Sequence, residues 1–239
     1  MIEDKYLDVK LMSYTNRPNS TVYQGMHQCV IHESVFYSVL DEDKAGKIIV
    51  KRLLEGNRGH YSPLELASFV FNVIGYPHDV IGQATRHRTG VSFSVQSFRY
   101  TGEFLMSATR EDIERYFYVP PVGMLMLDRE GNKAKYTENM RLRDLDFIMI
   151  AVLKYQECVL AGVPYEDARR LLPAGYRQNF VVGFNARSLL HFCDLRAKAN
   201  AQAEIRDLAE RLFNIFSDYM PEVANWYQKN RMGKAILSP

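Results

Sequence analysis

Cysteine is scarce in this sequence of 239 residues, and its three copies stand far apart. Cys29, Cys158 and Cys193 form neither a C-x-x-C pair nor a zinc-ligand spacing, so the sequence predicts no disulfide framework and no metal site. Because three is an odd number, at least one thiol is free. The simplest interpretation is a set of buried, reduced thiols in a cytoplasmic protein.

Net charge is nearly absent as well. The 30 Lys and Arg residues against 28 Asp and Glu leave a formal charge of +2, which argues against a nucleic-acid coat and a polybasic membrane anchor. No run of about eighteen apolar residues is present to span a bilayer, and the first ten residues lack the apolar core of a signal peptide. We therefore expect a cytoplasmic protein with no membrane and no nucleic-acid partner.

Several common catalytic motifs are missing. The sequence has no GxxxxGK[ST], no GxGxxG after a strand, no HExxH and no GxSxG. Their absence argues against a P-loop nucleotide site, a Rossmann dinucleotide site, a zinc protease and an α/β-hydrolase.

The apolar pattern predicts a single α+β domain over residues 1–239, with a mostly antiparallel sheet and helices packed on it, because successive βαβ units are lacking. The segment from Ser62 to Glu65 has the form of a capping box that opens a short helix. Residues 1–50 and 217–239 are expected to be peripheral. We expect strands at 6–14, 68–74, 116–119 and 178–185, an extended segment after Gly90, a loop tip at 128–132, and helices at 22–40, 43–54, from 77, and at 137–160, 165–172, 186–195 and 200–216.

The segment RHRTGVSFSVQSFRY, residues 86–100, stands out from this background. It holds three arginines and a histidine among small hydroxyl side chains and has no acidic residue. Arginine suits phosphate because its planar fork donates two hydrogen bonds and keeps its charge. The segment therefore predicts a site for a phosphorylated ligand, to which the segments of Arg169 and Arg196 are candidates to contribute. The residues alone predict no reaction.

In company with other motifs, this segment resembles the signature of the flavin-dependent thymidylate synthases. The resemblance covers about residues 53–216 and depends on several motifs in the expected order. They are His60, Ser62 and Glu65 for H-x-[ST]-x-x-E, Gln83 three residues before Arg86, the R-H-R and S-x-R-Y of residues 86–100, Ala168-Arg169 with Leu172-Pro173 for A-R-x-x-L-P, Asn185 to Leu189 for N-A-R-S-L, Leu195 to Ala197 for L-R-A, and Ala201-Gln202 with Glu204.

The resemblance implies an enzyme that makes dTMP from dUMP, with methylenetetrahydrofolate as carbon donor and NADPH as reductant through FAD. It also implies a twisted sheet with helices and a homotetramer whose active sites lie between subunits. The flavin carries the hard chemistry in such an enzyme, and the protein supplies placement and electrostatics. No enzyme nucleophile is needed, so neither Ser97 nor a cysteine is given that role.

The resemblance also implies roles for individual residues. Arg99 and the backbone amides near Ser97 and Phe98 would hold the phosphate of dUMP. Arg196 would be catalytic, facing the uracil ring and stabilising the charge that develops as N3 loses its proton. The implied dUMP site comprises Gln83, Arg86, Gln96, Ser97, Phe98, Arg99, Arg169 and Arg196, and the implied FAD site comprises Ser62, Glu65, Arg86, His87, Arg88, Asn185, Arg187 and His191.

The sequence departs from the family pattern in the loop after the R-H-R motif. Eight residues, Thr89 to Gln96, precede the serine where the common pattern has seven, and Ser94-Val95-Gln96 replaces its Asn-Glu pair. Gln96 can hydrogen-bond in place of the glutamate but carries no charge. His191 and Asn200 stand where the family has asparagine and histidine.

Two alternatives remain at this point. One is a nucleotide or single-stranded nucleic-acid binding module that uses the basic residues with Phe93, Phe98 and Tyr100 as stacking surfaces; the low net charge counts against it. The other is a family member that binds flavin and nucleotide but has lost activity with the loop glutamate.

Overall fold

A four-stranded antiparallel sheet forms the centre of the computed structural model, which describes residues 1–56, 59–128 and 130–234. Its strand order is β1-β2-β6-β3, and each neighbouring pair is antiparallel. This confirms the α+β class and the antiparallel sheet. The strands are β1 (Asp8–Tyr14), β2 (Ser68–Pro77), β3 (Val91–Val95) and β6 (Arg177–Asn185), and a separate hairpin pairs β4 (Leu125–Leu127) with β5 (Lys133–Lys135).

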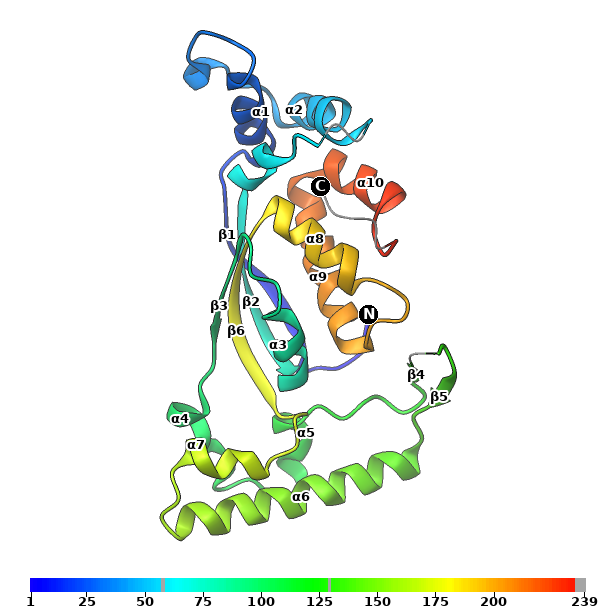
Figure 1. Ribbon diagram of the computed structural model, residues 1–239. Coiled ribbons are helices and arrows are strands. Elements are labelled where there is room, and N and C mark those ends of the chain that lie inside the picture. Colours follow the sequence, from blue (N-terminus) through cyan, green and yellow to red (C-terminus); the bar gives the residue numbers. More distant parts are fainter. Residues whose placement is uncertain (57–58, 129, 235–239) are drawn as a thin grey trace.

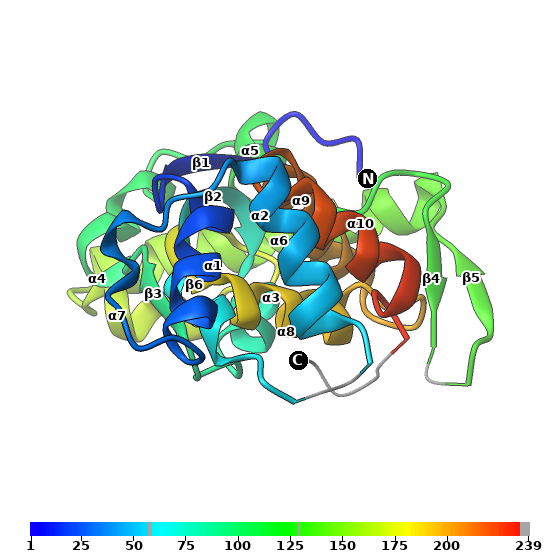
Figure 2. The ribbon, with the colours of Figure 1, turned by 90° about the horizontal axis from the view of Figure 1, so that it is seen from above.

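Helices gather on one face of the sheet and at its two ends (Figure 1). The face is covered by α3 (His78–Ala84), α8 (Ala186–Arg196), α9 (Ala203–Tyr219) and α10 (Pro221–Asn230). One end carries α1 (Pro18–Gln28) and α2 (Glu42–Ile49), and the other carries α4 (Phe98–Thr101), α5 (Ile113–Tyr116), α6 (Glu138–Leu160) and α7 (Tyr165–Ala168). Figure 2, seen from above, places the β4–β5 hairpin at one side of the molecule. None of the helices in the described ranges is long and apolar enough to cross a bilayer.

The described residues form two hydrophobic cores. The larger lies between the sheet and its helices, where alternate strand residues such as Phe69, Phe71 and Phe184 are buried, as expected when one face of an antiparallel sheet is covered. The smaller lies along α6, where Phe98, Tyr155 and neighbouring side chains pack. β3 and β6 extend from the first core toward the second (Figure 1).

Most predicted elements are confirmed, but four expectations about the elements and the chain ends are wrong. The helix expected at 22–40 begins at Pro18 and ends at Gln28. The strand expected at 116–119 is reduced to one isolated bridge, between Phe117 and Tyr176. The capping box of Ser62 does not form, because Ser62 lies inside the 3₁₀ helix Ser62–Leu66, whose cap position is occupied by Tyr61 without a side-chain hydrogen bond.

The fourth wrong expectation concerns the ends of the chain, which are not peripheral. β1 is an edge strand of the sheet, and Val22 and Ile49 are fully buried. At the other end Tyr227 of α10 is fully buried, and its hydroxyl donates to the carbonyl of Leu190 at 2.5 Å. Residues 235–239 of the predicted tail lie outside the described residues.

The thiols differ in exposure. All three cysteines are free, but only Cys193 is buried, Cys158 is half-buried and Cys29 is exposed, so the expectation of three buried thiols is wrong. Burial raises the pKa of the Cys193 thiol, which keeps it protonated and unreactive.

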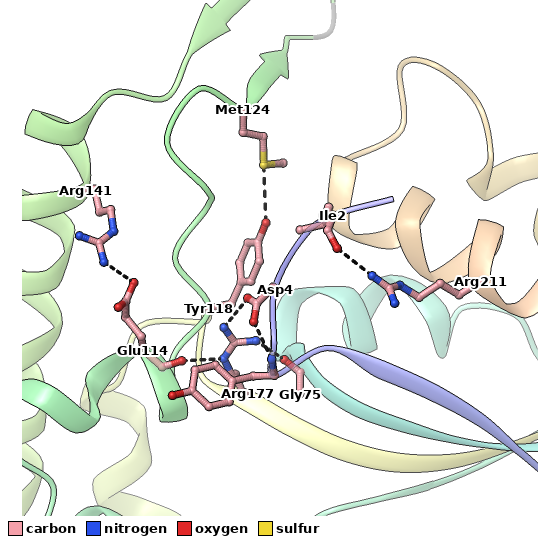
Figure 3. Close-up of polar contacts among 10 residues, drawn as sticks. Ile2, Asp4, Gly75, Glu114, Tyr118, Met124, Arg141, Arg177 and Arg211 are labelled. Atoms are coloured by element: carbon pink, nitrogen blue, oxygen red, sulfur yellow. Dashed lines mark hydrogen bonds and ion pairs between the residues drawn. The ribbon is translucent and has the colours of Figure 1, made fainter.

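Arg177, the first residue of β6, joins the sheet to the N-terminal segment and to the α6 end (Figure 3). Its guanidinium forms an ion pair with Asp4 at 2.6 Å and donates to the carbonyls of Gly75 at 2.9 Å and Glu114 at 3.0 Å. The Glu114 carboxylate in turn binds Arg141 of α6 at 2.6 Å. The side chains of Arg177 and Asp4 are 6% and 10% exposed, so each charge depends on the other for stabilisation.

Gly75 allows this close packing. Its φ is +75°, and a Cβ there would collide with the backbone carbonyl of Tyr6. Glycine therefore lets the N-terminal segment lie directly against β2.

Replacing Arg177 by methionine should lower the free energy of unfolding by about 3–5 kcal/mol, because Asp4 would remain as a buried charge without its partner. Urea unfolding measures this loss. The control is Lys154→Met, which removes an exposed ion pair with Glu157 of similar length, 2.7 Å, and should leave the urea midpoint unchanged. Equal midpoints for the two variants would contradict the role of Arg177.

Candidate active site

The turn that carries the R-H-R motif is anchored on the first turn of α8. Asn185 caps α8 by accepting a hydrogen bond from the Ser188 amide at 2.8 Å. The Ser188 hydroxyl donates to the Thr89 carbonyl at 2.6 Å, and the Asn185 amide donates to the Gly90 carbonyl at 3.0 Å. Gly90 has a φ of +65° and a Cβ there would collide with Asn185 and Ser188. The turn therefore needs glycine to approach the helix.

Arg196, the last residue of α8, reaches back to this turn. Its Nε donates to Nε2 of His87 at 3.1 Å, and a terminal nitrogen donates to the Gln83 carbonyl at 2.9 Å. Because His87 accepts through Nε2, its ring is neutral with the proton on Nδ1. His191 lies beside it, with ring centroids 5.4 Å apart.

These side chains border a cavity of about 560 Å³. The predicted Arg86, His87, Arg88, His191 and Arg196 all line it, so the structure brings this part of the predicted site together. The sequence did not single out the other lining residues, which are Thr89, Ser188 and Leu195. Ser188 and Leu195 belong to the N-A-R-S-L and L-R-A motifs, so their motif membership was the available signal.

The cavity disfavours added positive charge. Burial, followed by the charges of Arg196, His191 and Arg86, lowers the pKa of His87 to about 4. Burial and the charge of Arg86 also lower the pKa of Arg196. Partial desolvation among like charges makes the cavity a favourable place for an anion.

A second group of predicted residues lies at the opposite end of β3. Arg99 of α4 has its Nε 3.4 Å from a carboxylate oxygen of Glu166, and Arg169 donates to the carbonyl of the same residue at 3.1 Å. Both arginines are exposed. Ser97, the cap residue of α4, precedes them and its side chain makes no capping hydrogen bond.

Two predicted residues beside this group serve the fold in this chain. The Gln96 side chain accepts from the Asn179 amide at 3.1 Å and its carbonyl accepts from Gln178 at 2.8 Å, so it closes the β3–β6 ladder. The Phe98 side chain is buried in the smaller core. Gln96 thus hydrogen-bonds, as expected, but to the backbone of the neighbouring strand.

A third group lies near the start of α8. Glu65 forms an ion pair with Arg187 at 2.7 Å. Ser62, also predicted here, lies on the same 3₁₀ helix as Glu65 and is exposed.

The groups of Arg196 and Arg99 are far apart within one chain. Gly90 and Ser97 flank β3, whose five residues extend roughly 16 Å. Figure 1 shows α8 and α4 near opposite ends of that strand. The R-H-R turn and the Arg99 group therefore lie at opposite ends of β3.

The stacking surface of the alternative nucleic-acid module is not formed. Phe98 is buried, and Phe93 packs into the larger core beside Phe180 and Phe184. Of the three aromatic residues proposed for stacking, Tyr100 alone is exposed, at 81%.

Acidification should destabilise the protein through His87. The pKa of this residue is lowered from 6.5 to about 4 on folding, so between these pH values the unfolded chain binds more protons and the free energy of unfolding falls as the pH falls. Unfolding measured from pH 7 to pH 4 should show this loss in the wild type and in His32→Gln, which removes an exposed histidine. His87→Gln should lose less stability over this pH range, because the contribution of His87 is absent. A pH profile for His87→Gln identical to that of the wild type would contradict the assignment.

Comparison with known proteins agrees with these features. The family model described as thymidylate synthase complementing protein matches residues 10–222. The flavin-dependent thymidylate synthase of Haloarcula marismortui is 31% identical over 95% of this chain and 98% of its own, and that of Halobacterium salinarum is 32% identical over 94% and 98%.

Solved structures share the fold. Thymidylate synthase X from Helicobacter pylori, determined with FAD and dUMP, aligns with a TM-score of 0.72 at 20% identity over 94% of this chain and all of that one. A UMP/dUMP methylase, PolB from Streptomyces cacaoi, aligns with a TM-score of 0.76 at 23% identity over 98% and 97%. With a family model that matches most of the chain and curated relatives that match it nearly end to end, this protein belongs to the flavin-dependent thymidylate synthases.

Proposed function

We propose that this chain catalyses the reductive methylation of dUMP to dTMP, with methylenetetrahydrofolate as carbon donor and NADPH, through FAD, as reductant. The observation that carries the proposal is the partly desolvated cationic cavity in which Arg196 is fixed by His87 and by the Gln83 carbonyl. Its lining suits an anionic nucleotide and the electron-rich edge of a uracil ring.

The residues around the R-H-R turn fit FAD. Arg88 supplies a positive charge at the cavity, and Arg187 supplies another in the first turn of α8. Helix N-termini favour pyrophosphate because their backbone N–H groups point outward. The bound flavin would supply the redox chemistry, while these residues bind and orient it.

Arg196 is the proposed catalytic residue. Two hydrogen bonds hold its guanidinium before substrate arrives, so little reorganisation is needed at the moment of reaction. A fixed cation at the uracil edge stabilises negative charge that develops as N3 loses its proton. Neutral His87 assists by accepting from Arg196 without adding repulsion.

Arg99 and Arg169 are proposed to bind the phosphate of dUMP. Glu166 holds both side chains on one surface, where their forks can donate to the same phosphate. We propose that this surface meets the Arg196 cavity of another subunit, because β3 separates the two within one chain.

Each chain is proposed to fold as a single domain, and four chains are proposed to assemble as a homotetramer. The support is α6, whose outward face exposes Phe147, Ile150 and Leu153 at 62%, 66% and 47%. Three large apolar side chains at helical spacing on one exposed face are typical of a protein interface.

Flavin reduction tests the function. On protein reconstituted with FAD, anaerobic bleaching of the flavin absorption by NADPH should quicken when dUMP is added, and the complete mixture should yield dTMP. Arg196→Ala should retain the flavin and lose at least about 100-fold in turnover, since it removes charge stabilisation. The control Arg110→Ala, which removes an arginine paired with Asp146 at the α6 end, should retain activity. Folded, flavin-loaded wild type that made no dTMP would refute the proposal.

The quaternary structure is tested by light scattering. The wild type should have four times the 27.7 kDa mass of the chain, and Phe147→Glu combined with Ile150→Glu should dissociate it, because burying two carboxylates is costly. Val122→Glu, at a valine that is 51% exposed outside α6, is the control and should keep the wild-type mass. A double variant that stays tetrameric would place the interface elsewhere.

A further inference from the structure

Gln202 occupies the cap position of α9 but does not cap the helix. Its side chain makes no capping hydrogen bond, although the position normally favours a short side chain that accepts from the first turn. The side chain instead extends to α3, so its structural use lies in the contact between the two helices.

On α3, Gln202 bridges two residues that lie four positions apart and so share one face. Its Nε2 donates to Asp79 at 2.8 Å, and its Oε1 accepts from the side-chain amide of Gln83 at 2.5 Å. The three side chains form a continuous row from Asp79 through Gln202 to Gln83.

The carboxylate fixes the direction of the whole row. An ionised aspartate only accepts hydrogen bonds, and Asp79 lies in the first turn of α3, where the helix dipole favours its charge. Gln202 must therefore turn its NH₂ group to Asp79 and its oxygen to Gln83. Gln83 then donates one N–H to Gln202. This hydrogen bond fixes the orientation of its amide oxygen and of its second N–H.

Among the described residues, the Asp79 carboxylate accepts a side-chain hydrogen bond from Gln202 alone. Its second oxygen, Oδ1, is shielded from solvent and has no hydrogen-bond partner among the described residues, which makes this aspartate costly for packing alone. A locally unfavourable residue is often explained by a functional site nearby, and here the site is one hydrogen bond beyond Gln202.

Gln83 also contacts the catalytic arginine, because Arg196 donates to the Gln83 carbonyl at 2.9 Å. Six residues after Arg196, Gln202 returns to α3. The stretch between them is thus tied at both ends to Gln83.

We propose that Asp79 and Gln202 are positioning residues that hold the Gln83 amide in one orientation for dUMP. The inference rests on the proposed function, in which Gln83 contacts the nucleotide. It extends the site to two residues outside the implied dUMP and FAD sites.

The test measures dUMP affinity of the flavin-loaded enzyme by equilibrium dialysis. Gln202→Ala should weaken binding by about 3–10-fold, the usual value of one hydrogen bond, while the flavin content stays the same. Gln202→Glu should weaken it further, because its carboxylate would face Asp79. The control Asp41→Asn makes an aspartate-to-amide change at the distant cap of α2, where asparagine also caps, and should bind dUMP as the wild type does.

A double-mutant cycle tests the order of the row. Asp79→Ala should weaken dUMP binding in the wild type but have little effect in Gln202→Ala, because Asp79 acts through Gln202. Independent, additive effects would overturn the proposal, as would unchanged affinity in Gln202→Ala.

Failure of the proposed function would look different. If the wild type bound no dUMP, the proposed function would be wrong. The positioning role would then be tested by crystal structures of the unliganded wild type and Gln202→Ala. The Gln83 side chain should have one conformation in the wild type and several in Gln202→Ala. A single, unchanged conformation in the variant would overturn the positioning role whatever the substrate.

Discussion

A buried guanidinium, that of Arg177, is the interaction on which the arrangement of this chain depends. It lies where β6 begins and binds the N-terminal segment through Asp4, β2 through the Gly75 carbonyl, and the segment before α6 through the Glu114 carbonyl. The two hydrophobic cores meet near this residue. A buried arginine is stable only when its partners are in place. Arg177 therefore fixes the position of the α6 end of the chain against the sheet. It thereby also fixes where Arg99 and Arg169 lie relative to the cavity of Arg196.

The cavity itself brings together the side chains of three arginines and two histidines. Arg99 and Arg187 each have a carboxylate partner. Arg196 instead binds a neutral imidazole and a carbonyl. Such an arrangement is unfavourable until an anion arrives, and the lowered pKa of His87 records that cost. A site that is strained in this way binds developing negative charge more strongly than a solvated arginine would.

Local pattern was enough to predict β1, β2 and β6, most helices and the cationic character of residues 86–100, because these depend on periodicity and composition. It failed where distant partners decide the outcome. Glu65 pairs with Arg187 rather than with its own helix end, and Phe117 forms only one bridge, with Tyr176 just before β6. Gln202 shows the same limit: its motif was visible in the sequence, but its contact with α3 appears only in three dimensions.

The central claim is that each active site combines the Arg196 cavity of one subunit with the Arg99 surface of another. Mixed tetramers test it most directly. Arg99→Ala and Arg196→Ala, each inactive alone, are produced together with different affinity tags and purified through both. Shared sites predict that the mixture regains dTMP synthesis, since about a quarter of the sites in a random one-to-one assembly would hold both arginines. A doubly tagged mixture that stayed as inactive as its parents would show that one chain supplies both residues and would contradict the account.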